Sequence, residues 1–132
     1  FVAVGAPQGP LAEDRVYDMA DLIKMPLIAM ERGTSVRELL DGACQRLDTV
    51  VSPRFEVAHL ATAGALVAVN LGITLLPTLP LPVLPMERLI RRNISDFGVK
   101  RRIGLVHQPG RSLSPTASAF LDHVRRNVST SG

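Results

Sequence analysis

The alternation of short apolar runs with helical segments constrains the fold of this chain most strongly. Leu27 to Met30 is an apolar run typical of a buried strand, and it leads through Gly33-Thr34-Ser35 into a segment with apolar residues at helical spacing. A second run at 55–57 precedes an apolar helical segment from Leu60 to Asn70, and a third run covers Ile73 to Leu76. This alternation predicts an α/β domain with a mostly parallel sheet and helices on both of its faces.

Capping signals indicate where the helices begin. Asp18 is expected to cap a short helix that ends before Pro26, and Ser35 with Glu38 is interpreted as the capping box of the next helix. Ser114-Pro115 supplies the N-cap and the first residue of a final helix. The predicted apolar faces are Val36, Leu39, Leu40, Ala43 and Leu47 in the helix after Ser35, and Ala117, Phe120, Leu121, Val124 and Val128 in the final helix.

Two further strands and one stiff connection complete the expected elements. Phe1 to Val4 and Arg102 to His107 both have the composition of strands. Between 77 and 85 there are four prolines in nine residues, a density that predicts an extended, stiff connection without regular structure.

Composition limits the class of protein. The chain has 132 residues, 46% hydrophobic and 20% charged, which is typical of one globular domain. No apolar stretch is long enough to span a membrane, and no secretory signal pattern begins the sequence. Cys44 is the single cysteine, so an internal disulfide is excluded and a cytoplasmic location is expected.

The basic residues predict solvated surfaces more than a nucleic-acid site. The formal charge of +3 is associated with arginine-rich clusters, but aromatic residues make up only 4% of the chain and none lies among those clusters. Stacking platforms for single strands are therefore missing, and no zinc-finger or helix-turn-helix pattern is present. We expect this segment not to bind DNA directly.

Motifs for enzyme catalysis are also missing. The sequence contains no Gly-x-Ser-x-Gly elbow, no phosphate-cradling glycine-rich loop and no His-Glu-x-x-His motif, and His59, His107 and His123 are scattered. Cys44 is expected on the buried side of its helix. We therefore predict no catalytic residue, no metal site and no cofactor, and expect that the chain is not an enzyme.

The best candidate binding segment is Glu31-Arg32-Gly33-Thr34-Ser35, because it ends a strand and opens a helix. Free backbone N–H groups at a helix N-terminus, with the hydroxyls of Thr34 and Ser35, can receive an anionic group, and Arg32 can add positive charge. The alternative is that Ser35 only caps its own helix. A second candidate wall comprises His59 to Thr62 at the next helix start and Ile73-Thr74 after Gly72, with His59 favoured as an ordinary hydrogen-bonding residue.

Several segments, in their order and spacing, resemble the C-terminal effector-binding domain of LysR-type transcriptional regulators over nearly the whole chain. They are Phe1 to Ala12 with Pro7 and Pro10-Leu11-Ala12, Asp21-Leu22 followed by Pro26-Leu27-Ile28, Leu66-Val67 to Pro77, and Arg111-Ser112-Leu113-Ser114-Pro115 leading to Phe120. Gly9 stands where that family usually has His, and Asn70 stands where it often has Gly. Neither difference is expected to change the fold.

The resemblance implies a periplasmic-binding-protein-like (type 2) domain of two Rossmann-like lobes joined by two crossing strands. Residues 1–132 would be a fragment of it: 1–5 the first crossover strand, 6–100 the second lobe, and 101–132 the return strand and C-terminal helix of the first lobe. The N-terminal winged DNA-binding region has no counterpart here. Any contact with DNA would therefore be made through that missing domain.

The resemblance also implies a function and a site. A small effector would bind in the cleft between the lobes, contacted by Glu31, Arg32, Gly33, Thr34, Ser35, Thr62, Ile73 and Thr74, with Ala3 at the cleft floor and Thr34 as the first choice. The expected partners are this effector and further copies of the chain, as a dimer or a tetramer of the full-length protein, without a membrane. The competing interpretation is a periplasmic-type solute-binding protein, which shares the two-lobe architecture.

Overall fold

The computed structural model describes residues 1–98 and 103–127. It divides into unit 1, from Phe1 to Arg101, and unit 2, from Arg102 to Gly132. The elements of unit 1 are β1 (Val2–Gly5), α1 (Met19–Leu22), β2 (Ile28–Met30), α2 (Ser35–Gln45), β3 (Phe55–Val57), α3 (Leu60–Ala68), β4 (Thr74–Leu76), the 3₁₀ helices η1 (Leu81–Val83) and η2 (Met86–Arg88), and β5 (Ile90–Asn93). Unit 2 contains α4 (Pro115–Asn127).

The strands of unit 1 have mixed directions. β1 lies between β4 and β5 and is antiparallel to both, whereas β2 and β3 are paired in parallel. A parallel bridge between Leu27 and Ile73 connects the two sets, and the Ile28 N–H donates to the Ile73 carbonyl at 2.8 Å. Consequently β2, β3, β4 and β5 run in one direction and β1 runs against them.

The prediction of an α/β fold is confirmed, but its mostly parallel sheet is wrong for the three-stranded sheet. The parallel prediction holds for β2 and β3, which are connected through α2, since a helical crossover returns the chain to the same end of the sheet. β1 is not joined to either neighbour by such a crossover. It enters the sheet from the opposite end, and both of its ladders are antiparallel.

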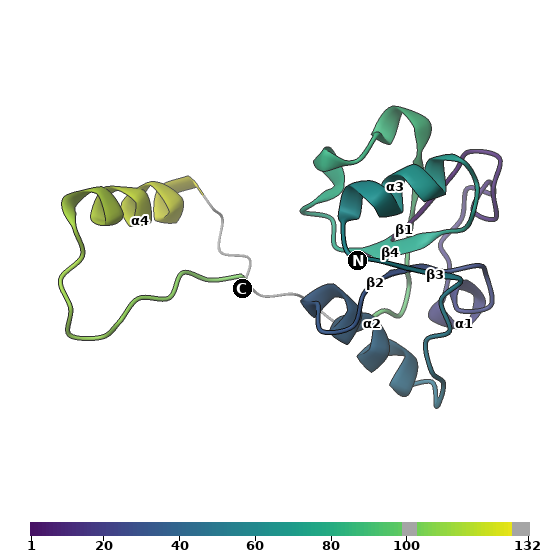
Figure 1. The fold of residues 1–132 in the computed structure, drawn as a ribbon, viewed down its shortest axis with the longest axis horizontal. Coiled ribbons are helices and arrows are strands. Elements are labelled where there is room, and N and C mark those ends of the chain that lie inside the picture. Colours follow the sequence, from purple (N-terminus) through teal and green to yellow (C-terminus); the bar gives the residue numbers. More distant parts are fainter. Residues whose placement is uncertain (99–102, 128–132) are drawn as a thin grey trace. The chain divides into compact units, whose positions relative to one another are not determined.

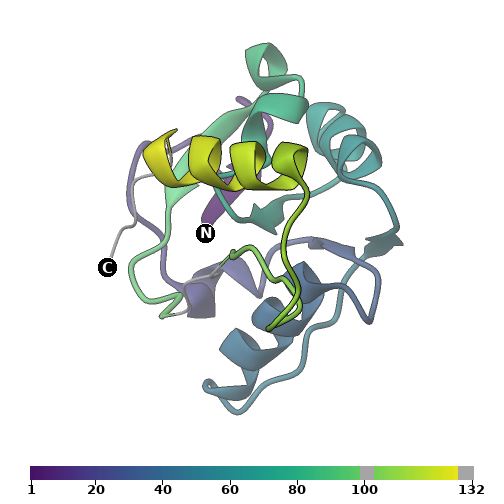
Figure 2. The ribbon, with the colours of Figure 1, turned by 90° about the vertical axis from the view of Figure 1, so that its left-hand side faces the viewer.

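Helices cover both faces of these strands, as Figures 1 and 2 show for α3 on one side and α1 and α2 on the other. One buried cluster combines Ala3 and Leu75 with Leu22 of α1 and Leu40 of α2. The other combines Val2, Val4, Ile28 and Leu76 with Ala63 and Val67 of α3 and with Leu81 and Leu84. Successive β1 residues therefore alternate between two cores, as the period of a strand requires.

The proline-rich segment and the strand after it differ from the prediction. Residues 77–85 contain η1 and lead into η2, because proline fits the first positions of a short helical turn, where its missing N–H costs nothing. β5 then pairs with β1 along Ile90 to Asn93. The sequence of β5 does not indicate a strand, because two of its four residues are arginines and only Ile90 is apolar.

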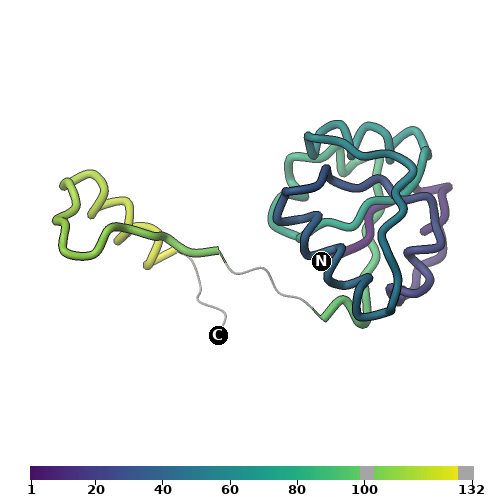
Figure 3. The backbone as a smooth tube through the Cα atoms, turned by 60° about the horizontal axis from the view of Figure 1, so that its bottom comes forward, coloured from purple at the N-terminus to yellow at the C-terminus, as the bar shows by residue number. Residues whose placement is uncertain are grey.

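In unit 2, the predicted final helix is confirmed, with the Ala117 N–H donating to Ser114 Oγ at 3.2 Å. Figure 3 traces the extended segment that precedes this helix. The predicted strand is wrong for 103–107, which have no regular structure, because the described part of unit 2 contains no second strand to pair with it. Arg102 and Val128 lie outside the described residues.

Candidate functional site

Three connections of unit 1 leave the sheet at the same edge. β2 and β3 are parallel, so loop 31–34 after β2 and Ala58-His59 after β3 both start at the carboxyl ends of their strands. β4 runs in the same direction and ends at Leu76, followed by buried Pro77 and exposed Thr78. We call this edge, with residues 31–35, 58–62 and 77–78, the carboxyl edge. In open α/β sheets it is where ligands are usually bound.

The start of β1 lies beside the carboxyl ends of β4 and β5. Val2 is paired with both Leu76 and Asn93, the last residues of β4 and β5. The Phe1 ring stacks on Phe97, with ring centroids 4.2 Å apart and an interplanar angle of 11°. The first and last described segments of unit 1 therefore lie together, and the Phe97 carbonyl also accepts from Arg46 at the C-terminal end of α2.

Loop 31–34 is a tight turn between β2 and α2. The Glu31 N–H donates to the Val57 carbonyl at 3.0 Å, which ties the loop to the end of β3. The Thr34 hydroxyl donates back to the Glu31 carbonyl at 2.9 Å. Gly33 has a φ of +86° and open space where a Cβ would stand, so the turn uses a conformation that glycine adopts readily.

The cap of α2 is Thr34, and the prediction of a capping box on Ser35 is wrong. Thr34 has extended backbone angles, and its Oγ1 accepts from the Arg37 N–H at 3.3 Å. Ser35 is the first helical residue and is exposed. Both hydroxyl residues suit an N-cap, and the earlier one takes the position because the chain is still extended at that point.

This arrangement leaves hydrogen-bond donors free at the N-terminus of α2. Among the described residues, no hydrogen bond reaches the backbone N–H of Gly33, Ser35 or Val36, or the hydroxyl of Ser35. Thr34 has its hydroxyl proton engaged with Glu31. The groups available to an incoming anion are therefore those of Ser35 and its neighbours more than the Thr34 side chain.

The charged residues of the loop lie on its exposed side. Glu31 and Arg32 are both exposed. Arg32 also lines an open depression of about 480 Å³ together with Glu38, Asp41 and other α2 residues. The carboxylates of this depression offset the positive charge that Arg32 brings.

The second predicted wall is only partly at the carboxyl edge. His59 is the N-cap residue of α3 but makes no side-chain capping bond, and Thr62 is exposed in the first turn of the helix. Ile73 and Thr74 lie at the start of β4, away from its carboxyl end, and they are 0% and 1% exposed. Ala3, at 0% exposure, lies in the middle of β1. The structure thus brings residues 31–35, His59 and Thr62 to one edge and covers the other three side chains.

The sequence interpretation missed Arg37, which is 1% exposed in the first turn of α2. It forms ion pairs with Asp41 at 2.8 Å and Glu56 at 2.6 Å and donates to the Met30 carbonyl at 3.2 Å. Burial lowers the pKa of Arg37, but hydrogen bonds to Asp41 and Glu56 outweigh burial and hold the pKa above its ordinary value. The available signal was the i,i+4 spacing of Arg37 and Asp41.

The described part of the chain contains neither a metal-binding cluster nor a membrane-spanning helix. Within 1–98 and 103–127, no group of three or more histidine, cysteine, aspartate or glutamate residues is placed to hold a metal ion. In the same ranges, no helix has the length and apolar character needed to cross a bilayer.

Comparison with known proteins identifies the family of this chain. The family model described as the LysR substrate binding domain matches residues 1–129. The chain is 34% identical over 99 residues to the uncharacterized HTH-type transcriptional regulator YfeR of Shigella flexneri, covering 75% of this chain and 32% of that protein. It is 32% identical over 124 residues to the hydrogen peroxide-inducible genes activator of Dickeya chrysanthemi, covering 90% of this chain and 39% of that protein.

Solved structures show the same fold. The regulatory domain of CcmR from Synechocystis PCC6803, in complex with 2-PG, superimposes with a TM-score of 0.84 at 23% identity, covering 98% of this chain and 63% of that one. The effector-binding domain of QuiR in complex with shikimate has a TM-score of 0.71 at 21% identity, covering 95% and 59%.

This chain spans about a third to two fifths of the length of those two curated relatives. The family match covers both described units, and the structural neighbours are regulatory or effector-binding domains. The chain therefore belongs to the LysR substrate binding domain family, with the fold of a LysR-type effector-binding domain.

Proposed function

We propose that this chain senses a small effector for a LysR-type transcription regulator and that the effector is anionic. The observation that carries the proposal is the set of free donors at the N-terminus of α2, on Gly33, Ser35 and Val36, at the carboxyl edge of the strands. Aligned backbone N–H groups and the helix dipole favour a carboxylate, phosphate or sulfate there.

The ligands of related domains support the proposal of a small effector. QuiR is named in complex with shikimate, and CcmR in complex with 2-PG. For this chain, we propose contacts from residues 31–35, with the Ser35 hydroxyl and N–H as the principal donors, and from Thr62 of α3. The burial of Ala3, Ile73 and Thr74 favours a supporting role for these three residues.

We further propose that residues 1–5 are the first crossover, that 6–100 form the second lobe, and that 101–132 belong to the first lobe. The apolar face of unit 2 supports this division. A groove of about 150 Å³ is lined by Leu105, Val106, Phe120 and other residues of unit 2, and Phe120 is 58% exposed. Such a face is expected to be covered by the rest of a first lobe in the intact protein.

In the intact regulator, effector binding would shift the balance between two arrangements of lobes or subunits, and a separate winged domain would carry DNA binding. The effector must then bind one arrangement more tightly than the other. We propose that the protein acts as a homo-oligomer in the cytoplasm and is not an enzyme. The curated relatives are transcriptional regulators, which favours this function over a periplasmic solute-binding protein.

A thermal-shift screen of small carboxylic and phosphorylated acids against the intact protein tests the proposal. A true effector raises the Tm in a concentration-dependent way, corresponding to about 2.7 kcal/mol at a hundredfold excess over Kd. Ser35→Ala should reduce that rise, because it removes a free donor without touching the cap of α2.

Variants at Thr34 serve as the matched controls. Thr34→Ser keeps the capping hydroxyl and should retain the effector response, whereas Thr34→Val should lower stability by about 1 kcal/mol before any ligand is added. The proposal is wrong if no acid stabilises the protein, or if Ser35→Ala responds as fully as the parent chain to every acid that does.

A further inference from the structure

Arg37 is the one charged residue that is buried among the described residues. Its partners Asp41 and Glu56 have side chains that are 46% and 41% exposed. Burying a cation is costly unless opposite charges and hydrogen-bond acceptors surround it. Here Nε donates to Asp41, and Nη1 donates to Glu56 and to the Met30 carbonyl. One side chain thus joins α2, the middle of β3 and the last residue of β2.

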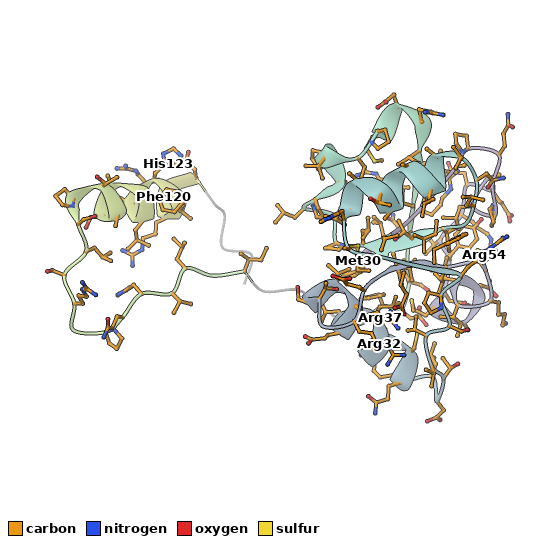
Figure 4. The ribbon with its side chains drawn as sticks, in the orientation of Figure 1. Met30, Arg32, Arg37, Arg54, Phe120 and His123 are labelled. Atoms are coloured by element: carbon orange, nitrogen blue, oxygen red, sulfur yellow. The ribbon has the colours of Figure 1, made fainter. Side chains whose placement is uncertain are left out.

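The guanidinium of Arg37 holds one end of loop 31–34, because Met30, whose carbonyl accepts from it, immediately precedes the loop. The other end is held by the backbone of the same residue, since the hydroxyl of Thr34, the last residue of the loop, accepts from the Arg37 backbone N–H. Figure 4 labels Met30 and Arg37, whose contact is described above, and Arg54, which immediately precedes β3. Residues 31–33 are exposed, so the loop depends on its two ends for its position.

The guanidinium itself is not placed to touch an effector. It is covered, and two carboxylates face it, so the cluster as a whole carries a net negative charge. A ligand anion at the carboxyl edge would gain little attraction from this cluster. Any influence of Arg37 on binding must therefore pass through the geometry of the loop.

We propose that Arg37 is a positioning residue for the effector site: it holds loop 31–34 so that the free donors of Gly33, Ser35 and Val36 keep a fixed arrangement. This inference rests on the proposed function for its importance to binding, but the loop geometry can be tested without any effector. Preorganised donors bind more tightly because less conformational freedom is lost when the ligand arrives.

The test is hydrogen–deuterium exchange of the intact protein, comparing peptides that cover 28–38 with peptides that cover 39–46. Arg37→Met should accelerate exchange in 28–38 about tenfold while 39–46 changes much less, because the Glu31 and Glu38 amides bracket the released loop. Arg37→Lys keeps the charge and should restore part of the protection. Leu40→Ala, at a buried α2 residue of the hydrophobic core, is the matched control and should accelerate both peptides together.

Glu56→Gln provides a milder second variant if Arg37→Met does not fold. It weakens one contact of the guanidinium from a half-exposed position and should still accelerate exchange selectively in 28–38. The proposal is overturned if the Arg37 and Glu56 variants show the same ratio between the two peptides as Leu40→Ala. A screen in which no acid binds would contradict the proposed function instead, and would leave this exchange comparison unaffected.

Discussion

At the scale of single residues, the two positions that differ from the family pattern are in contact. A Cβ added at Gly9 would stand 2.5 Å from Asn70 Oδ1, and Asn70 has a φ of 58°, a left-handed conformation in which glycine is favoured. Each difference looked harmless and independent in the sequence. In the structure, Gly9 provides the space that the Asn70 side chain occupies.

This contact predicts an energetic coupling. Gly9→Ala should destabilise the protein by about 1 kcal/mol, because the new methyl group collides with the Asn70 amide. The same substitution in an Asn70→Gly background should cost markedly less. Denaturant unfolding of the two single variants and the double variant measures the coupling energy, and equal costs in both backgrounds would exclude it.

The sequence alone did not show which of two adjacent residues caps α2. Thr34 and Ser35 carry similar hydroxyls, and only the backbone conformation decides which one caps α2. Arg37 was missed for a related reason. An arginine is expected at the surface, and its burial depends on Glu56 and Met30, which the helix pattern alone does not bring near.

At the scale of elements, two glycines inside helices should respond oppositely to alanine. Apart from its chain neighbours and the backbone of its own helix, no described atom lies within 4 Å of a Cβ placed at Gly42 of α2, so Gly42→Ala should stabilise the protein by about 0.5–1 kcal/mol through helix propensity. A Cβ at Gly64 of α3 would stand 2.9 Å from Leu84 Cδ2 and 3.3 Å from Pro85 Cδ, so Gly64→Ala should destabilise.

Thermal or denaturant unfolding of the two variants provides the measurement, with each serving as the control for the other. If both alanines stabilise, α3 does not pack as closely against the segment after η1 as the structure indicates. If both destabilise, helix propensity is not the deciding term at Gly42.

The elements that sequence predicted well are those with a strong local signal. β3 was predicted at its observed bounds, and the β2, α2, α3 and β4 predictions agree within a few residues. β5 was missed and the strand at 103–107 was wrong, because pairing with a distant strand decides both cases. Arg91 and Arg92 are part of a strand because β5 pairs with β1. The apolar residues after 102 have no neighbouring strand to pair with among the described residues of unit 2.

At the scale of the whole molecule, Cys44 reports on the integrity of the core. It is 0% exposed within the cluster that joins the strands to α1, α2 and Phe97. Burial, followed by the nearby charge of Asp41, raises the pKa of its thiol, and Arg37 offsets this only in part. The native thiol is therefore neutral at pH 7 and should react with alkylating reagents only when the core opens.

The raised pKa predicts a dependence of stability on pH. The contribution of Cys44 is fully present below the pKa of the unfolded thiol, about 8.5, and is lost as the pH rises through the folded value. The free energy of unfolding should therefore fall in alkaline solution, and Cys44→Ala should show a shallower fall. Parallel slopes for the two proteins between about pH 7 and about pH 10 would show that other groups cause the change.

The stacking of Phe1 on Phe97 brings the two ends of the described part of unit 1 together. Because these two ends are neighbours, the segment between them has the geometry of a large loop that carries its own core. It can in principle be excised and transplanted between two adjacent residues of an unrelated host. Only the two chain connections beside Phe1 and Phe97 would have to be joined to the new host.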